Sequence, residues 1–195
     1  PMVLVELNGA SDNPLIDPVE GEALHGGNFY GGHMAFAADA LKPAVTNVAA
    51  LLERQLVKLN QTHTSGGLPE NLVAVTDDER GAHHGFKAME ITASALTAEA
   101  LKLTMPASAF SRSTEGHNQD KVSMGTIAAR DSMQVLDLTE TVAAIAALAL
   151  CQAVDLRGVD QCRPRTLAMH QKIRQHVPVN SGDRRQDLDI QRVLE

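Results

Sequence analysis

Apolar residues recur at spacings of three and four along the middle of the chain, the pattern of one face of an α-helix. The first such stretch covers 33–59. Pro43 lies inside it and predicts a kink, because proline lacks the backbone N–H that a helix interior uses. A second helix is predicted over 86–103, and Pro106 ends it.

A third and longer helix is predicted over 120–156, with Gly158 in the position where glycine commonly ends a helix. Its middle, 142–150, is apolar on every side, which predicts burial on every side within a bundle or an oligomer. Three helices could not surround such a stretch by themselves. We therefore expect the chain to be a fragment of something larger, an obligate oligomer, or both.

The two ends of the chain are less regular. Turn-forming Asn-Pro, Asp-Pro and Gly-Gly pairs fill 1–32, which predicts an irregular segment. Short helices are predicted over 164–177 and 187–194. The chain thus divides into a loop region over 1–32, a long-helix bundle core over 33–158 and a region of short helices over 159–195. This organisation predicts an all-α fold.

Composition agrees with helices and excludes some partners. Aromatic residues make up 3% of the chain, so its apolar mass is Ala, Leu and Val, which favours helix over a β-sandwich. The net charge of −7 argues against nucleic-acid binding, which needs concentrated positive charge. Two cysteines form no disulfide framework, so we expect a cytoplasmic protein. The longest apolar run, 142–150, is too short to cross a bilayer, so we expect no membrane partner.

Two familiar ligand motifs are incomplete. The glycine cluster over 26–32 has part of a phosphate-loop spacing, but His33 and Met34 stand where Lys and Ser or Thr are required, so we reject that interpretation. Its glycines leave a plain loop and a binding site equally open. Adjacent His83 and His84 would point apart in a helix or strand, so we expect no metal site. The other histidines expected on the surface are His25, His63, His170 and His176.

A dense polar cluster covers 115–120, just before the long apolar helix. It holds two carboxylates, two carboxamides and an imidazole. One interpretation is a helix cap, in which Asn118 or Asp120 accepts hydrogen bonds from the first backbone N–H groups. A cap explains one of these residues, and a substrate is an alternative partner for the others. Both interpretations stay open on the residues alone.

Five short motifs follow one another along nearly the whole chain. They are Asp12 to Ile16, Gly27 to Phe29, Ser65 to Pro69, Gly85 to Lys87 and His117 to Gly125. In these motifs and their order the chain resembles the aromatic amino-acid ammonia-lyases and aminomutases, the family of the histidine, phenylalanine and tyrosine lyases. The resemblance covers about the last two-fifths of such enzymes.

The resemblance implies a long-helix bundle that is part of a larger helical homotetramer, with active sites built from several subunits. It also implies a methylidene-imidazolone (MIO) prosthetic group, which the family forms from an internal Ala-Ser-Gly. This sequence contains no Ala-Ser-Gly, and Ala10-Ser11-Asp12 is only a near match. We therefore expect the chain to associate with a missing N-terminal part and to be inactive alone. The loop region over 1–32 becomes an active-site loop region.

The resemblance also assigns roles to individual residues. The implied catalytic residues are Phe29, Lys87, Glu115 and Gln119, and the implied substrate-binding residues are Asn13 and Asn118. Phe29 would lie beside the electrophilic ring, and Lys87 and Glu115 would face the substrate amine. The carboxamides of Asn118 and Gln119 would hydrogen-bond the ring or polar groups of the substrate. Asn13 would order its loop near the site.

Substrate type follows from the same positions. Histidine-specific relatives usually have Met in place of Lys87 and Gln-Glu-Asp in place of 118–120, whereas this chain follows the phenylalanine/tyrosine type. We expect elimination of ammonia from an aromatic amino acid to give an arylacrylate. Histidine ammonia-lyase, an aromatic 2,3-aminomutase and a non-catalytic helical oligomerisation fragment are the alternatives. Tyr30 replaces the commoner His or Gln, and its effect is open.

Overall fold

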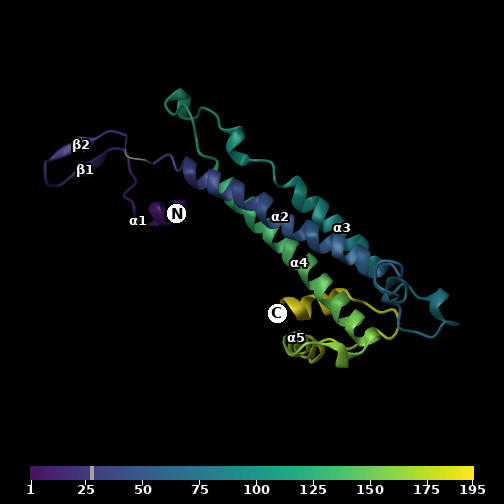
Figure 1. The fold of residues 1–195 in the computed structure, drawn as a ribbon. Helices are drawn as coiled ribbons and strands as arrows, with labels where there is room; N and C mark the ends of the chain where they lie inside the picture. The colour runs from purple at the N-terminus through teal and green to yellow at the C-terminus, as the bar shows by residue number, and fades with distance from the viewer. Residues whose placement is uncertain (27–28) are drawn as a thin grey trace. The chain divides into compact units, whose positions relative to one another are not determined.

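The computed structural model describes residues 1–26 and 29–195, and α-helices dominate it (Figure 1). The α-helices and strands are α1 Met2–Asn8, β1 Leu15–Asp17, β2 Glu22–Leu24, α2 Gly32–Asn60, α3 Lys87–Lys102, α4 Gly125–Arg157, α5 Pro164–Arg174 and α6 Asp187–Leu194. Short 3-10 helices are η1 Glu70–Leu72, η2 Arg80–Ala82, η3 Ala107–Phe110, η4 Glu115–His117 and η5 Val159–Gln161. The expected all-α class is confirmed.

The chain divides into two compact units. The first unit comprises Pro1–Ala44 and Lys102–Val135, and the second comprises Val45–Leu101 and Leu136–Glu195. The helices α2 and α4 each contribute residues to both units. Packing thus divides the chain differently from the sequence-based order of loop region, bundle core and short helices, which stays a prediction.

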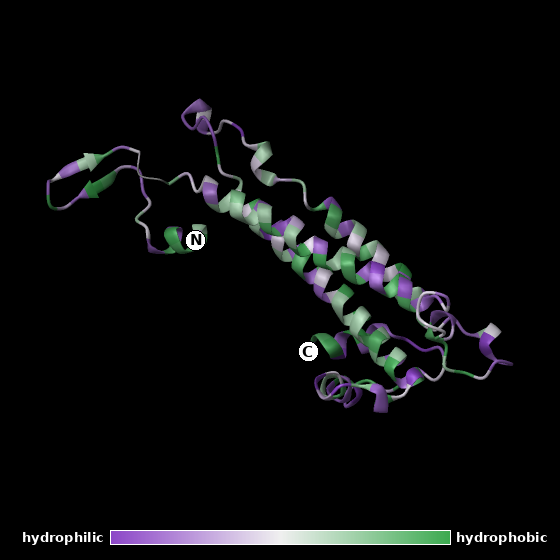
Figure 2. Cartoon of the chain, viewed as in Figure 1, coloured by the Kyte–Doolittle hydropathy of each residue, from purple (hydrophilic) through white to green (hydrophobic). Residues whose placement is uncertain are grey.

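The hydrophobic core of the second unit forms where α2, α3 and α4 pack. Val142 and Ile145 of α4 are fully buried, and Leu56 and Met89 bring α2 and α3 against the same core. Green, apolar residues mark much of the second half of α4 (Figure 2). Leu150 is nevertheless 54% exposed, so this chain by itself does not cover the stretch over 142–150 on every side, and its burial within a bundle or an oligomer stays a prediction.

The exposed side of α4 borders an open apolar groove with a volume of about 300 Å³. Leu150 and Ala147 line it from α4, and Met169 and Ile173 line it from α5. Ala147 and Leu150 stand three residues apart, on one face of α4. The apolar stretch over 142–150 therefore includes one stripe that this chain leaves uncovered.

The predicted helix boundaries hold for α2 and α3, and Pro43 lies inside a continuous α2. The start of the long helix at 120 is wrong. The Ser123 hydroxyl accepts the N–H of Gly125 at 3.2 Å, so α4 begins at Gly125 and neither Asn118 nor Asp120 caps it. At the other end, Gly158 has a φ of 107° and its N–H donates to the Val154 carbonyl, which confirms the glycine end of the helix.

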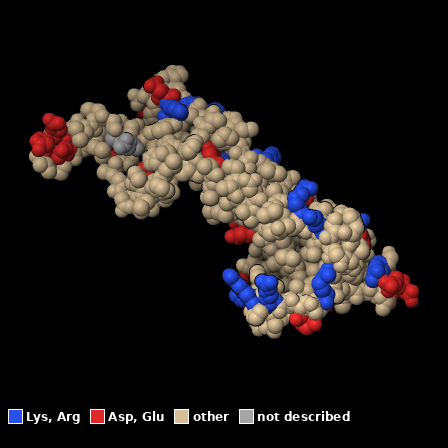
Figure 3. Space-filling view, in the orientation of Figure 1, with Lys and Arg blue, Asp and Glu red and all other residues tan. Residues whose placement is uncertain are grey.

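The segment over 1–32 is more ordered than predicted. The strands β1 and β2 pair antiparallel, with Leu15 opposite Leu24. Asp17 closes the connecting turn, because its carboxylate accepts the N–H groups of Val19 and Glu20 at 2.8 and 3.2 Å. Acidic side chains gather at this end of the hairpin (Figure 3). Strands of three residues are too short to show a clear alternation, which is why the pattern did not reveal them.

A buried ion pair fixes the first unit. Lys42 of α2 is fully buried, and its Nζ lies 2.9 Å from Asp39 Oδ1 and 3.6 Å from Asp131 Oδ2 of α4. Burial would raise the pKa of Asp39. Lys42 and the N–H groups of Ala107 and Ser108 outweigh that effect and lower the pKa to about 2. The same contacts hold the chain at 107–108 against α2.

By length and hydropathy alone, α2 and α4 could each cross a membrane. Half of the most apolar stretch of α4 is buried within the chain, as in the core helix of a folded bundle. The buried charges of Asp39 and Lys42 in α2 also suit a packed interior, where each charge has a partner. The absence of a membrane partner stays a prediction.

Replacing Asp39 with Asn should lower the free energy of unfolding by about 3 kcal/mol, because Lys42 stays buried without its nearest counter-charge. The pKa of Asp39 is lower in the folded chain than in the unfolded chain. Its contribution to stability is therefore present above about pH 4 and is lost as the pH falls toward about 2.

Urea unfolding followed by circular dichroism between about pH 6 and pH 2 checks this expectation. The wild type should converge on Asp39→Asn at the acid end, while the exposed control Asp78→Asn should track the wild type throughout. A difference between wild type and Asp39→Asn that stays constant with pH would contradict the assigned role of the carboxylate.

Candidate functional site

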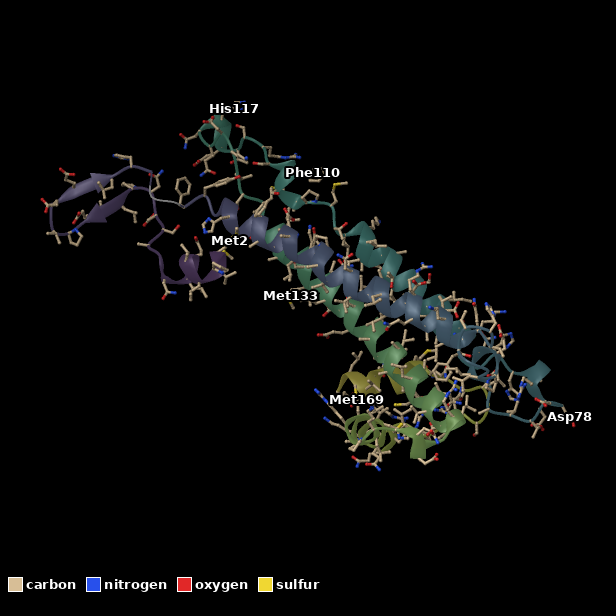
Figure 4. All side chains as sticks on the ribbon, viewed as in Figure 1. Met2, Asp78, Phe110, His117, Met133 and Met169 are labelled. Carbon is tan, nitrogen blue, oxygen red and sulfur yellow. The ribbon has the colours of Figure 1, made fainter. Side chains whose placement is uncertain are left out.

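The polar cluster before α4 forms a tight turn in the first unit. Glu115, Gly116 and His117 have φ angles of 55°, 59° and 70°, a left-handed backbone that costs free energy at the two residues with side chains. The turn is closed at its base, where Thr114 and Gln119 exchange backbone hydrogen bonds of 2.9 and 3.3 Å. Figure 4 shows His117 on this turn. Such strain persists only where the surroundings impose it, and it is common at functional sites.

The closed turn brings three predicted site residues together. Asn118 Nδ2 donates to Glu115 Oε2 at 3.1 Å, which orients the carboxylate. The Thr114 hydroxyl donates to Gln119 Oε1 at 3.3 Å. Within the described part of the chain, no group accepts a hydrogen bond from the Gln119 side-chain NH₂. The turn therefore presents one carboxylate and one amide donor that a ligand could use.

The segment that carries Phe29 lies beside the chain that follows this turn. Lys121 Nζ is 5.8 Å from the centre of the Tyr30 ring, and a Cβ on Gly31 would lie 3.9 Å from Ser123 Oγ. Phe29 itself is exposed over half of its surface. Tyr30 and Gly31, which follow Phe29, thus lie close to the segment just after Gln119. Gly27 and Asn28, which belong to the same motif, lie outside the described residues.

Asn13 and Lys87 are placed less directly. Asn13 is exposed at the start of the hairpin, where its N–H donates to Asp12 Oδ1 at 2.8 Å. Lys87 is the exposed first residue of α3 and belongs to the second unit, whereas Glu115 belongs to the first. A pairing of Lys87 with Glu115, which would join residues of different units, stays a prediction.

Sequence reasoning missed a polar cluster in the second unit. His170 is only 8% exposed, so its expected surface position is wrong. Its Nε2 lies 2.7 Å from Asp155 Oδ1, and Arg174 donates twice to Asp155 Oδ2, at 2.8 and 2.6 Å. His170 and Arg174 stand four residues apart on α5, which places them on one face toward α4. The spacing of His170 and Arg174 could have indicated a shared partner. Nothing in the sequence around Asp155 indicates that it is this partner.

This cluster joins helices and shows no sign of a nucleophile. Burial raises the pKa of the Cys151 thiol, one turn from Asp155 on α4, and keeps it protonated at neutral pH. Among the described residues, no group of three or more His, Cys, Asp and Glu side chains is arranged to hold a metal ion. His83 and His84 instead lie within 3.8 Å of the carboxylate of Asp183.

A family model described as aromatic amino acid lyase matches residues 1–175 of the chain. The chain belongs to this family. The match includes the strained turn, the segment around Phe29 and the start of α3.

Three relatives illustrate the range of the aromatic amino acid lyases. The chain is 43% identical to a histidine ammonia-lyase from Aromatoleum aromaticum, over 94% of this chain and 34% of that protein. It is 41% identical to a tyrosine ammonia-lyase from Cupriavidus metallidurans, over 95% and 34%. It is also 41% identical to an MIO-dependent tyrosine 2,3-aminomutase from Streptomyces globisporus, over 98% and 35%.

A crystal structure of tyrosine aminomutase from Streptomyces globisporus superposes on 99% of this chain and 36% of its own, with a TM-score of 0.93 at 40% identity. The chain therefore spans about a third of the length of the relatives it matches. Near-equal identity to histidine and tyrosine enzymes and to an aminomutase does not separate their activities.

Replacing Asp155 with Asn should destabilise the second unit by about 2 kcal/mol, because Arg174 and His170 lose the charge that both contact. Urea unfolding by circular dichroism gives the value. The matched control is Asp160→Asn, at an exposed position whose carboxylate accepts a hydrogen bond from its neighbour Gln161. Equal losses in the two variants would show that the cluster contributes no more than a surface contact.

Proposed function

We propose that this chain forms the C-terminal part of an aromatic amino-acid ammonia-lyase of the phenylalanine/tyrosine type. Such an enzyme would release ammonia from its substrate and give an arylacrylate. The observation that carries the proposal is the strained turn, which gathers Glu115, Asn118 and Gln119 beside the segment of Phe29. Membership of the family and the likeness to a tyrosine ammonia-lyase support it.

Elimination needs an amine that can leave and a weakly acidic β-proton that a base can take. An MIO group, which would form on polypeptide outside this chain, supplies an electrophile for the amine. The donor set here suits such a group, because the Gln119 NH₂ can donate to a carbonyl oxygen of a neutral ring or to a carboxylate.

Glu115 would accept a proton at its Oε atoms from the substrate ammonium. Asn118 holds that carboxylate in one orientation through its hydrogen bond to Oε2, so the acceptor is aimed before the substrate arrives. Lys87 would face the same amine as a second proton carrier. Phe29, half exposed, would pack against the aromatic ring and exclude water.

The substrate type rests on a few positions. Lys87, Glu115 and Asn118-Gln119 follow the phenylalanine/tyrosine type, which favours an aromatic ring without an imidazole. A histidine substrate is the alternative that the Aromatoleum aromaticum relative favours. A 2,3-aminomutase, which returns the amine to the β-carbon, is favoured by the superposition on tyrosine aminomutase.

The proposal includes partners. An aromatic amino acid is the substrate, and the chain works in a homotetramer or together with the missing N-terminal part, in the cytoplasm, without nucleic acid or membrane. The apolar groove beside Leu150 and the exposed Met133 of α4 support association, because isolated chains rarely leave such side chains uncovered on a core helix.

A chimera tests the function directly. The C-terminal third of the Cupriavidus metallidurans tyrosine ammonia-lyase is replaced by this chain, with which it is 41% identical. Incubation with Phe, Tyr or His is followed by near-ultraviolet absorbance for arylacrylates and by chromatography for β-amino acids. We expect an arylacrylate from Phe or Tyr, and no turnover by the chain alone.

Each other outcome has its own meaning. An acrylate from His alone would move the assignment to histidine ammonia-lyase, and a β-amino acid would move it to an aminomutase. A folded tetrameric chimera without any turnover would favour the non-catalytic fragment. Turnover by the chain alone would refute an electrophile located on other polypeptide.

In the active chimera, Glu115→Gln should lower kcat about 100- to 1,000-fold, because the amide cannot accept the proton that the carboxylate takes. Glu79→Gln, at an exposed glutamate far along the chain, is the matched control and should retain full activity. Thermal unfolding should agree for both variants and the wild type, since Glu115 is exposed. Unchanged turnover in Glu115→Gln would exclude it from the proton transfer.

A further inference from the structure

The loop before Lys87 is held by a carboxylate from near the end of the chain. Asp183 accepts the backbone N–H of His84 at 2.8 Å and the N–H of Gly85 at 2.9 Å. In return, the N–H of Asp183 donates to Nδ1 of His83 at 3.3 Å. Three hydrogen bonds therefore join one residue to three consecutive residues about a hundred positions away.

The loop held by Asp183 has little freedom to settle elsewhere. Gly85 has a φ of 54°, and a Cβ there would lie 2.4 Å from the Asn71 carbonyl oxygen, so only glycine fits. The next residue, Phe86, is buried; its N–H donates to Asn71 at 2.8 Å and its carbonyl accepts from Asn60 Nδ2 at 3.3 Å. Lys87 follows directly and begins α3.

The segment that carries Asp183 is anchored through Asn180. Gln152 of α4 is fully buried, and its side chain bonds the Asn180 backbone twice, as donor to the carbonyl and as acceptor from the N–H, both at 3.0 Å. The same amide also donates to the carbonyl of Leu72 at 3.3 Å. One glutamine therefore ties both the segment of Asp183 and the loop next to Asn71 to α4.

The charge of Asp183 suits this task. Burial would raise its pKa, but the N–H donors of His84 and Gly85 outweigh that effect, so the pKa lies below its ordinary value and the group stays ionised at neutral pH. A negative charge just before Lys87 also lies at the end of α3 where the helix dipole favours it.

We infer that Asp183 is a positioning residue for Lys87: its carboxylate fixes the 83–86 loop and thereby the place from which the Lys87 ammonium reaches the substrate amine. The inference rests on the proposed function, because it gives Lys87 a catalytic task. Asp183 acts through the backbone and needs no contact with the substrate.

The test uses the chimera described above. Asp183→Ala should lower kcat about 10- to 100-fold with KM nearly unchanged, because a small displacement of a catalytic group has effects of this size. Asp183→Asn keeps one acceptor oxygen and should fall between Asp183→Ala and the wild type. Asp187→Ala, at an exposed aspartate that pairs with Arg185, is the matched control and should leave kcat unchanged.

A double variant separates positioning from general loss of structure. If Asp183 acts through Lys87, adding Asp183→Ala to Lys87→Met should change kcat less than about twofold, since the group to be positioned is already gone. A further loss as large as in the single variant would overturn the inference, as would full activity in Asp183→Ala.

Hydrogen exchange keeps the two proposals apart. Amides in 83–86 should exchange at least about tenfold faster in Asp183→Ala than in the wild type or Asp187→Ala. If the wild-type chimera is inactive but Asp183→Ala still exchanges faster, the proposed function and the role of Lys87 are refuted. The hold of Asp183 on the 83–86 loop is then still established. Unchanged exchange in Asp183→Ala would show that Asp183 does not hold the 83–86 loop, whatever the activity.

Discussion

The first unit depends on one constraint, the burial of the charged side chain of Lys42 on α2. A fully buried ammonium needs acceptors on every side, and Asp39, Asp131 and the Met105 carbonyl supply them. Because Asp39 also accepts the N–H groups at 107–108, the ion pair holds the segment between α3 and the strained turn against α2. The ion pair therefore anchors one end of the segment that leads to the turn of Glu115.

The second unit solves a similar problem with neutral groups. Gln152 and Asn60 each bond backbone atoms of loops that have no regular partners of their own. Buried carboxamides can donate and accept at once, so a single side chain can satisfy two loop segments. Lys87 begins α3 directly after the loop residues that Asn60 and Asp183 bond.

Periodicity predicted α2 and α3 and the end of α4 at Gly158, because those features depend on local spacing and on one conformational rule. It did not predict the start of α4, which is set by the Ser123 cap rather than by the more conspicuous polar residues before it. The motifs pointed to Glu115, Asn118 and Gln119 as site residues, and the structure joins them on one turn. Their joining could not be predicted, since it requires left-handed backbone at Glu115 and His117.

Contacts between distant segments were invisible for a different reason. His170 finds its acid on another helix, and Asp183 binds backbone N–H groups that every residue except proline possesses. The division into two units could not be predicted from the sequence either. Their boundaries at 44–45, 101–102 and 135–136 fall inside α2, α3 and α4 rather than in loops. Neither unit can therefore be excised for separate expression without severing both long helices, and truncation at the loops will not yield independently folding pieces.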